Sequence, residues 1–433
     1  MMVRWIAGGR VIDPDQDVDR LADLELADGK VVGLHPVGTA PSQEDTLDAS
    51  GRWVMPGMID IHVHFREPGQ EYKEDLLTGA RAAVAGGVTT VVCMPNTMPA
   101  IDKREVVGLL RRRAAQIGLC DVQVCGAISR GLKGEELADL GEMALAGAAC
   151  FSDDGHAVMN AGLLRRAFEY ASDLDLMLML HEEEMDLSNG GSMHEGAVSS
   201  RAGLRGIPSA SESALIARDL EIAHEFGGRM HVCHMSTKRG VELVRAAKAR
   251  GWPISAEVTP HHLFLTDLAV LESHYHGHTK MNPPLRPWEH VEALREGLKD
   301  GTIEAIATDH APHGDVEKDE AFGCCAFGVT GLETSFSLTR RLVDEGVISL
   351  SRAVELHTSG PAKVMNWNDR GTFRAGTRAD VCIFDPERVW IVDPSVGFSK
   401  SVNTPFTGWE LKGQVSTTVF GGRVVYHEGK PAA

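Results

Sequence analysis

Short apolar runs that alternate with polar or amphipathic segments fill the stretch from Pro56 to Ala362. Strand-length runs that alternate with helix-forming segments are typical of a βαβ architecture with parallel strands. Eight strands are predicted, at residues 59–64, 88–94, 122–128, 147–152, 176–181, 229–234, 253–258 and 303–308. Helices are predicted at residues 104–118, 161–172, 210–226, 238–251, 290–301 and 331–346. The pattern therefore predicts an α/β fold, a closed (β/α)8 barrel of the TIM type, whose chemistry lies at the carboxyl ends of the strands.

The two ends of the chain follow a different pattern, in which short β-rich runs alternate with turns that contain Gly, Asp or Pro. We expect the ends to pair into one β-sandwich that flanks the barrel. The predicted domains are a composite β-sandwich from residues 1–55 and 366–433, and a barrel from residues 56–365. The total of 433 residues suits a barrel of roughly 250 to 300 residues with a smaller unit beside it.

Charge and hydropathy exclude several classes of protein. The formal net charge is -18, and the longest basic block is Arg111 to Arg113, so nucleic acid is not expected as a partner. The N-terminus lacks an apolar signal region, and no apolar stretch has the length of a membrane span. We therefore expect a cytoplasmic protein with no membrane contact.

The chain contains eight cysteines. Six of them lie in or beside apolar runs, which is typical of buried free thiols in a reducing compartment. These six are Cys93, Cys120, Cys125, Cys150, Cys233 and Cys382. Cys324 and Cys325 are adjacent in a glycine-flanked loop, where we expect them to face solvent and to have no catalytic role.

Candidate metal ligands stand at the ends of five predicted strands. His62 and His64 are two positions apart on the first strand, so their imidazoles point to the same side. The other strand ends carry Asp153 and Asp154, His181, His234, and Asp309. Four imidazoles together with carboxylates suit zinc or a similar divalent ion, and they exceed what one tetrahedral ion requires. A pair of ions bridged by a carboxylate is therefore a plausible site.

Two more histidines, His261 and His262, follow the seventh predicted strand. They could support the metal ligands through hydrogen bonds, or they could make structural hydrogen bonds only. His231 lies inside a strand and is expected to be packed in the core.

Several longer motifs make the resemblance to a known family specific. They are PGMIDIHVHFREPG, TTVVCMPNTMP, FSDDG, HVCHMSTKRG, AEVTPHHL, KMNPPLR, ATDHAPH and FGVTGLET, and together they span the whole barrel. On these motifs the chain resembles the amidohydrolase superfamily and, within it, the class I dihydroorotases. The terminal β regions also resemble the composite β-sandwich of that superfamily.

The resemblance implies a set of metal ligands, and it selects Asp154 over Asp153. The implied ligands are His62, His64, Asp154, His181, His234 and Asp309. Many relatives, including hydantoinases, bridge two ions with a carboxylated lysine at the fourth strand. The stretch from Gly147 to Gly155 contains no lysine. This difference favours the dihydroorotase branch that uses aspartate.

The resemblance also implies contacts with the substrate. They fall on His64, Arg66, Asn96, Asn282 and His313, with the backbone around Phe327 and Gly328. A guanidinium, an amide and an imidazole can together orient the exocyclic carboxylate of dihydroorotate. The family usually has Ala-Pro before Phe-Gly, whereas this chain has Cys325-Ala326, which leaves the rigidity and closure of this loop open.

The implied activity is the zinc-dependent, reversible hydrolysis of (S)-dihydroorotate to N-carbamoyl-L-aspartate, with one or two zinc ions per chain. Asp309 is the implied general acid and base. The resemblance further implies a homodimer that can associate with aspartate transcarbamoylase. Two alternatives are another cyclic-amide hydrolase, of the allantoinase or hydantoinase type, and a non-catalytic dihydroorotase-like partner of aspartate transcarbamoylase. The complete ligand set speaks against the second alternative.

Overall fold

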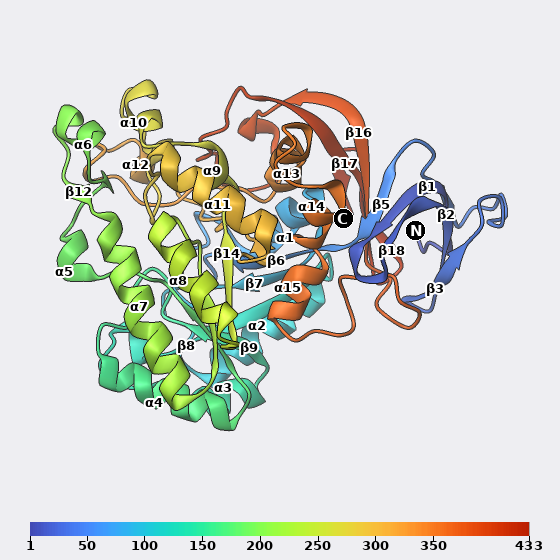
Figure 1. Ribbon diagram of the computed structural model, residues 1–433. Helices are drawn as coiled ribbons and strands as arrows, with labels where there is room; N and C mark the ends of the chain where they lie inside the picture. The colour runs from blue at the N-terminus through green and yellow to red at the C-terminus, as the bar shows by residue number, and fades with distance from the viewer. Residues whose placement is uncertain (433) are drawn as a thin grey trace.

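The barrel strands form one parallel sheet in a computed structural model that describes residues 1–432 (Figure 1). Their order around the sheet is that of the sequence, as expected when each strand is followed by a crossover segment. The strands are β6 (Met58–Val63), β7 (Val88–Cys93), β8 (Asp121–Ala127), β9 (Ala148–Ser152), β10 (Met177–Leu180), β13 (Arg229–Val232), β14 (Ile254–Val258) and β15 (Ala305–Ile306). All eight predicted strands are present, and each begins and ends close to its predicted position.

The barrel closes between its first and last strands. Val63 at the end of β6 forms a parallel bridge with His310, which also bridges Val329. The backbone N–H of His64 donates to the carbonyl of His310 at 2.9 Å. The predicted (β/α)8 fold class is confirmed.

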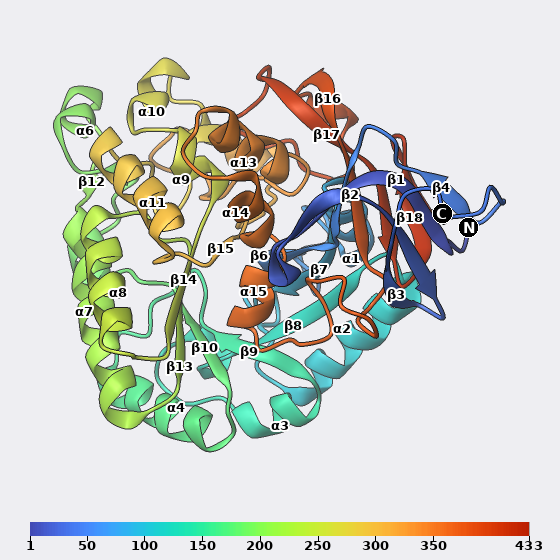
Figure 2. The same cartoon turned by 45° about the vertical axis from the view of Figure 1, so that its right-hand side comes forward.

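Helices surround the barrel strands and form an arc around the sheet in Figure 2. The six predicted helices correspond to α2 (Arg104–Ile117), α4 (Ala161–Asp173), α7 (Ser209–Phe226), α8 (Lys238–Ala249), α11 (Trp288–Asp300) and α13 (Ser335–Asp344). Helices that the sequence did not predict are α1 (Leu76–Ala85), α3 (Leu140–Leu145), α5 (Met185–Ser188), α6 (Ala197–Ala202), α9 (Pro260–Phe264), α10 (Leu268–Glu272), α12 (Asp315–Lys318), α14 (Leu350–Glu355) and α15 (Ser359–Val364). A two-stranded pair, β11 (Met193–His194) and β12 (Gly206–Ile207), extends the connection between α5 and α7.

The two ends of the chain pair into one flanking sheet of nine strands, on which both termini lie (Figure 1). Its strands are β1 (Trp5–Asp13), β2 (Val18–Ala27), β3 (Lys30–His35), β4 (Thr46–Asp48), β5 (Trp53–Pro56), β16 (Val381–Ile391), β17 (Glu410–Phe420), β18 (Arg423–His427) and β19 (Lys430–Pro431). The two halves join where β5 pairs antiparallel with β16. A separate apolar core that includes Ile6, Leu24, Val54 and Ile383 stabilises this unit. The division into residues 1–55 with 366–433 and residues 56–365 stays a prediction.

The interior of the barrel is mainly apolar, as expected for parallel strands covered on both faces, and it also holds a buried contact between His231 Nε2 and Glu257 Oε2 at 3.2 Å. Cys125 and Cys150 lie opposite each other on β8 and β9 in this interior. The six cysteines predicted to be buried are buried. The prediction for Cys325 was wrong: its thiol is buried and donates to the carbonyl of Phe322 at 3.5 Å, whereas Cys324 is exposed.

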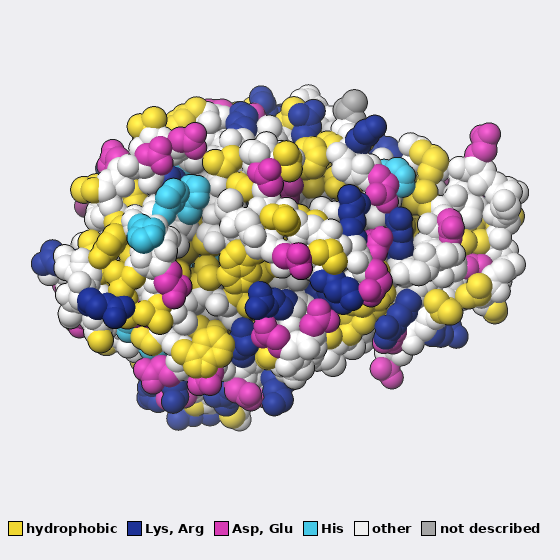
Figure 3. Space-filling model, turned by 90° about the horizontal axis from the view of Figure 1, so that it is seen from above, with side chains coloured by type: hydrophobic (Ala, Val, Ile, Leu, Met, Phe, Trp, Pro, Cys, Tyr) yellow, Lys and Arg dark blue, Asp and Glu magenta, His cyan; other side chains and the backbone are white. Residues whose placement is uncertain are grey.

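The surface carries charges of both signs. Acidic and basic side chains intermingle on the face shown in Figure 3. Among residues 1–432, no helix combines the length and the apolar composition that crossing a membrane requires.

Candidate metal centre and substrate pocket

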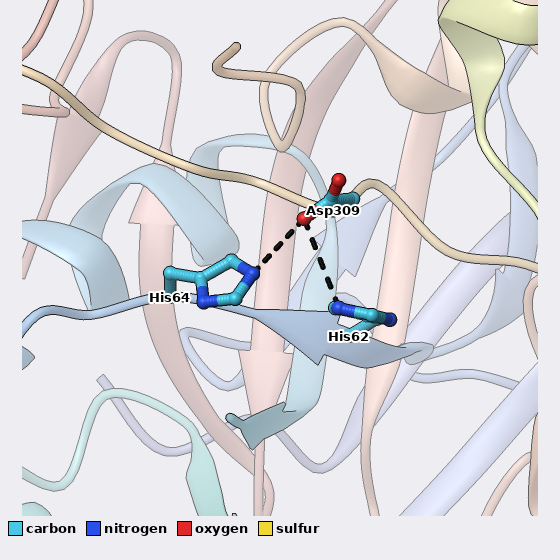
Figure 4. A group of neighbouring side chains, drawn as sticks. All are labelled: His62, His64 and Asp309. Atoms are coloured by element: carbon cyan, nitrogen blue, oxygen red, sulfur yellow. Dashed lines mark hydrogen bonds and ion pairs between the residues drawn. The ribbon is translucent and has the colours of Figure 1, made fainter. Parts of the chain in front are cut away.

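The ends of the barrel strands bring the predicted metal ligands into one buried cluster. His62 lies near the end of β6, and His64 follows that strand directly. Asp309 comes after β15, and its Oδ1 lies 3.0 Å from His64 Nε2 and 3.7 Å from His62 Nε2 (Figure 4). These three side chains offer ligand atoms within 4.8 Å of one another.

Asp154 occupies the centre of the cluster. Its Oδ1 lies 3.2 Å from His62 Nε2, 3.4 Å from His234 Nε2 and 3.9 Å from His181 Nδ1. Its Oδ2 lies 3.4 Å from His64 Nε2. The carboxylate therefore faces all four imidazoles, with three of them near Oδ1 and His64 near Oδ2.

Asp153 turns away from the cluster. Its Oδ1 accepts hydrogen bonds from the backbone N–H groups of Ile128 and Ser129, each at 2.9 Å, and the Ser129 hydroxyl donates to its Oδ2. A carboxylate with these partners stabilises the loop after β8. The structure thus brings Asp154, and not Asp153, together with the histidines.

Three of the four imidazoles have a polar partner on the side away from Asp154. His62 Nδ1 lies 2.6 Å from Glu257 Oε1, His181 Nε2 lies 3.0 Å from Glu183 Oε2, and His64 Nδ1 lies 2.8 Å from Asn96 Oδ1. These acceptors hold the ring proton, so that the other nitrogen presents a lone pair to the cluster. Such partners orient the ligands in metalloenzymes and raise their basicity.

The sequence did not single out Glu257 and Glu183. Glu257 stands inside the apolar run of β14, and a charged residue in a fully buried strand is a signal that it has a polar partner. Glu183 is one of three consecutive glutamates, so the sequence cannot distinguish it from its neighbours.

The donors in the cluster fit a divalent cation. His62 Nε2 is buried and has no hydrogen-bond partner among residues 1–432, although Asp154 Oδ1 is 3.2 Å away. When His62 is neutral, with its proton on Nδ1 toward Glu257, a lone pair of Nε2 faces the Asp154 carboxylate across this gap. A cation between them removes that repulsion, and imidazole and carboxylate ligands suit zinc and similar ions.

The charges in the cluster perturb its carboxylates. Burial by itself raises the pKa of Asp154, but the neighbouring imidazoles of His62, His64 and His234 outweigh burial and hold the pKa well below its ordinary value. Asp309 follows the same pattern, since its contacts with His64 and His62 lower its pKa. Both carboxylates are therefore ionised at neutral pH and available as ligands.

A pocket of about 230 Å³ opens beside the cluster. Its lining includes five of the predicted metal ligands and every predicted substrate contact. These residues are His64, Arg66, Asn96, Asp154, His181, Asn282, Asp309, His234, His313, Phe327 and Gly328, together with Gly155 and Ala311. His62 is the one predicted site residue that lies behind the pocket wall.

Arg66 is a buried cation that faces this pocket without a carboxylate partner. It is 7% exposed, its Nε donates to the Pro312 carbonyl at 3.1 Å, and its Nη2 lies 3.2 Å from His313 Nε2. Among residues 1–432, no carboxylate oxygen lies within 4.0 Å of its guanidinium. A buried arginine is normally paired, so this one is available to an anion in the pocket.

His313 is a neutral imidazole in this arrangement. Burial, together with the charges of Arg66 and Lys73, lowers its pKa far below the ordinary value. Its Nδ1 lies 3.4 Å from Lys73 Nζ, and Lys73 forms an ion pair with Glu317 at 2.7 Å. His313 can therefore donate or accept one hydrogen bond without adding a charge.

The remaining predicted residues have distinct environments. Asn282 lines the pocket, and its Nδ2 donates to Glu183 Oε2 at 2.7 Å. His262 uses both ring nitrogens in hydrogen bonds, to the Thr259 hydroxyl at 2.8 Å and to the Pro283 carbonyl at 2.9 Å, which favours the structural alternative. His261 is buried near Asp309 and His234, and its Nε2 has no hydrogen-bond partner among residues 1–432.

Two family models match overlapping parts of the chain. A family model described as dihydro-orotase-like matches residues 51–240, and one described as amidohydrolase family matches residues 203–426. A dihydroorotase of Anaeromyxobacter sp. (strain K) is 50% identical over 99% of both chains. A dihydroorotase of Geobacter metallireducens is 47% identical over 97% of this chain and 99% of its own.

Solved structures share the fold at lower identity. The L-hydantoinase (dihydropyrimidinase) from Arthrobacter aurescens has a TM-score of 0.89 at 26% identity, over 100% of this chain and 98% of its own. A dihydropyrimidinase from Brevibacillus agri has a TM-score of 0.86 at 21% identity, over 99% and 96% of the two chains, which indicates the fold alone.

Proposed function

The chain belongs to the dihydroorotase family, and from this premise we propose that its pocket catalyses the reversible hydrolysis of (S)-dihydroorotate to N-carbamoyl-L-aspartate. The enzyme acts on a cyclic amide, as its family membership indicates. In the reverse direction the same groups cyclise carbamoyl-aspartate, which is the direction of pyrimidine biosynthesis.

The observation that carries this proposal is the unpaired guanidinium of Arg66 in the same pocket as the ligand cluster. Dihydroorotate differs from neutral cyclic amides such as dihydrouracil by one carboxylate. A planar guanidinium binds a carboxylate through two parallel charge-assisted hydrogen bonds. We propose that Arg66 binds this carboxylate, with Asn96, Asn282 and His313 as further contacts and the backbone of Phe327 and Gly328 as the opposite wall.

We propose zinc as the cofactor, held by His62, His64, Asp154, His181, His234 and Asp309. Ligand atoms of His62, His64 and Asp309 cluster together, as do those of His62, Asp154 and His234. The two groups support one or two ions per chain, with Asp154 facing both. A bound divalent ion lowers the pKa of water and polarises the carbonyl that is attacked.

The residues of the chain orient the substrate and move the proton. Arg66 and His313 fix the carboxylate end of dihydroorotate, so that the ring amide faces Asp309. The carboxylate of Asp309, 3.0 Å from His64, accepts the proton of the attacking water. It then returns that proton to the ring nitrogen as the carbon–nitrogen bond breaks. Asp309 is thus the general base in the first step and the general acid in the second.

The alternatives fit these observations less well. A hydrolase of neutral cyclic amides has no use for an unpaired buried arginine, and identity to the hydantoinase is 26% against 50% for the dihydroorotase. A non-catalytic partner of aspartate transcarbamoylase would not need six clustered ligands. A homodimer, association with aspartate transcarbamoylase and a cytoplasmic location stay predictions.

The preference for a carboxylated substrate tests the proposal. We expect kcat/KM for dihydroorotate to exceed that for dihydrouracil by about 100-fold or more, since only dihydroorotate can pair with Arg66. Steady-state assays of both substrates with one zinc-loaded preparation give this ratio. Equal values would remove the argument from Arg66 and favour a hydrolase of neutral amides.

A further inference from the structure

A buried lysine holds one wall of the pocket from behind. Lys318, the last residue of α12, is 1% exposed, and its Nζ donates to three backbone carbonyls. The acceptors are Ala326 at 2.7 Å, Gly328 at 2.9 Å and Lys280 at 3.2 Å. An ammonium group has three protons to donate, so all of its donors have partners.

No carboxylate compensates this charge. Among residues 1–432, no carboxylate oxygen lies within 4.0 Å of Lys318 Nζ, whereas Lys73 and Lys248 each form an ion pair with a glutamate. Burial lowers the pKa of Lys318 to about 8, so the side chain is mostly protonated at neutral pH. A buried cation that has only carbonyl partners is costly compared with an apolar side chain of similar volume.

The three carbonyls belong to two segments that line the pocket. Ala326 and Gly328 flank Phe327 in the loop after α12, and Lys280 precedes Asn282 by two positions. The N–H of Gly328 donates to the Lys280 carbonyl at 3.0 Å, so the two segments are already in contact there. The Lys318 ammonium binds both from behind, while the side chain itself does not line the pocket.

Further contacts tie the same loop to its surroundings. The Nζ of Lys280 lies 4.4 Å from the centre of the Phe327 ring and donates to the Gly323 carbonyl at 3.1 Å. Asn403 Nδ2 donates to the carbonyls of Gly328 and Ala311, each at 3.0 Å. The carbonyl of Gly328 thus accepts from both an ammonium and an amide, and Lys318 joins this carbonyl to the carbonyls of Ala326 and Lys280.

We propose that Lys318 is a positioning residue for substrate binding: its ammonium fixes the backbone of the 326–328 segment against the Lys280–Asn282 segment, and thereby sets the pocket wall that contacts dihydroorotate. This inference rests on the proposed function. Because Lys318 acts through the loop and does not touch the ligand cluster, its loss affects the binding of substrate more than the proton transfer by Asp309.

The test uses Lys318→Gln and Lys318→Met in the full-length, zinc-loaded enzyme. Glutamine keeps two N–H donors without the charge, and methionine keeps the volume without any donor. The matched control is Lys248→Met. Lys248 donates to the carbonyls of Gly301 and Thr302 before β15, at the opposite end of the barrel strands from the pocket.

We expect KM for dihydroorotate to rise about tenfold or more in Lys318→Met and to rise less in Lys318→Gln. In both variants kcat should change much less than KM, because the lost interaction serves substrate binding. Zinc content should stay at the wild-type level. Hydrogen exchange at the amides of Ala326, Phe327 and Gly328 should become faster in both variants. Lys248→Met should lower thermal stability while leaving KM and these amides unchanged.

A wild-type KM in Lys318→Gln, or a change in KM no larger than that of Lys248→Met, would overturn the inference. If Lys318→Met does not fold, Lys318→Gln carries the test alone. Failure of the proposed function has a different signature, because the wild-type enzyme would then not turn over dihydroorotate. The exchange rates would in that case still report whether Lys318 holds the loop.

Discussion

Substitution of Arg66 by methionine tests how the pocket selects its substrate. In the structure, Nε of Arg66 is committed to the Pro312 carbonyl and Nη2 to His313, which leaves Nη1 and one proton of Nη2 for a ligand. These donors form one edge of the guanidinium and can bind a carboxylate through two bonds. At 7% exposure such a pair contributes about 2 to 4 kcal/mol, so Arg66→Met should lower kcat/KM for dihydroorotate by roughly 30- to 1000-fold.

The assay compares dihydroorotate with dihydrouracil, which has no carboxylate to lose, and its turnover should change far less. Zinc content should not change, because Arg66 is not a ligand. Arg340→Met is the matched control, since Arg340 is also buried, donates to the Pro386 carbonyl and lies outside the pocket. Equal losses for both substrates, or an equal loss in the control, would refute the reasoning, because Arg66 would then support the fold or the metal site.

Three further predictions concern Asp309, Glu257 and Glu333. Asp309→Asn should lower kcat by about 100-fold or more, while some zinc stays bound. Near-normal turnover would mean that another group transfers the proton, and His261 would be the first candidate. Glu257→Gln should weaken zinc affinity or activity by about 10- to 100-fold, because His62 loses the carboxylate 2.6 Å from its Nδ1. Competition with a chelator measures the affinity, and an unchanged affinity would contradict this prediction. Burial raises the pKa of Glu333 from 4.5 to about 7, so folding takes up a proton and stability falls as the pH rises from about 4.5 through 7. The free energy of unfolding of Glu333→Gln should therefore exceed that of the wild type by at most about 3 kcal/mol at pH 8, and the two should be nearly equal at pH 4.5. Urea unfolding at both pH values measures this difference. The same difference in free energy at pH 8 and at pH 4.5 would refute the prediction.

The barrel was predictable because parallel strands covered on both faces appear as short, continuous apolar runs. The strand predicted at residues 122–128 is observed at Asp121–Ala127, and the one predicted at 253–258 is observed at Ile254–Val258. The pairing of the chain ends was predictable for a related reason, since both ends carry strand-sized runs and turns that a barrel does not need.

Helix α1 was missed because most of its surface is buried and its polar face is narrow. It packs against β7, β17, β18 and β19, so seven of its ten residues are buried, and its sequence LLTGARAAVA offers only Thr78 and Arg81 as polar side chains. Periodicity detects a helix that is half exposed and fails for one enclosed between two layers.

The candidate site divides in the same way. The clustering of the candidate metal ligands was predictable because the fold places the carboxyl ends of all strands at one mouth, whereas the choice of Asp154 over Asp153 came from the family resemblance. Glu183, Lys318 and Asn403 act through contacts that depend on how separate loops meet, and no local pattern marks them. Ala326 is a further example: its N–H donates to the Glu317 carbonyl at 2.9 Å, a bond that the proline usual in the family cannot make.

The central claim, a metal-dependent dihydroorotase, is tested most directly by measuring metal content and turnover on one preparation. Elemental analysis should find about one to two zinc ions per chain. The same sample should hydrolyse dihydroorotate far faster than hydantoin or allantoin, lose activity in proportion to the zinc removed by a chelator, and regain it when zinc is restored. Full turnover of dihydroorotate by protein that elemental analysis finds free of metal, or faster turnover of hydantoin than of dihydroorotate, would contradict the claim.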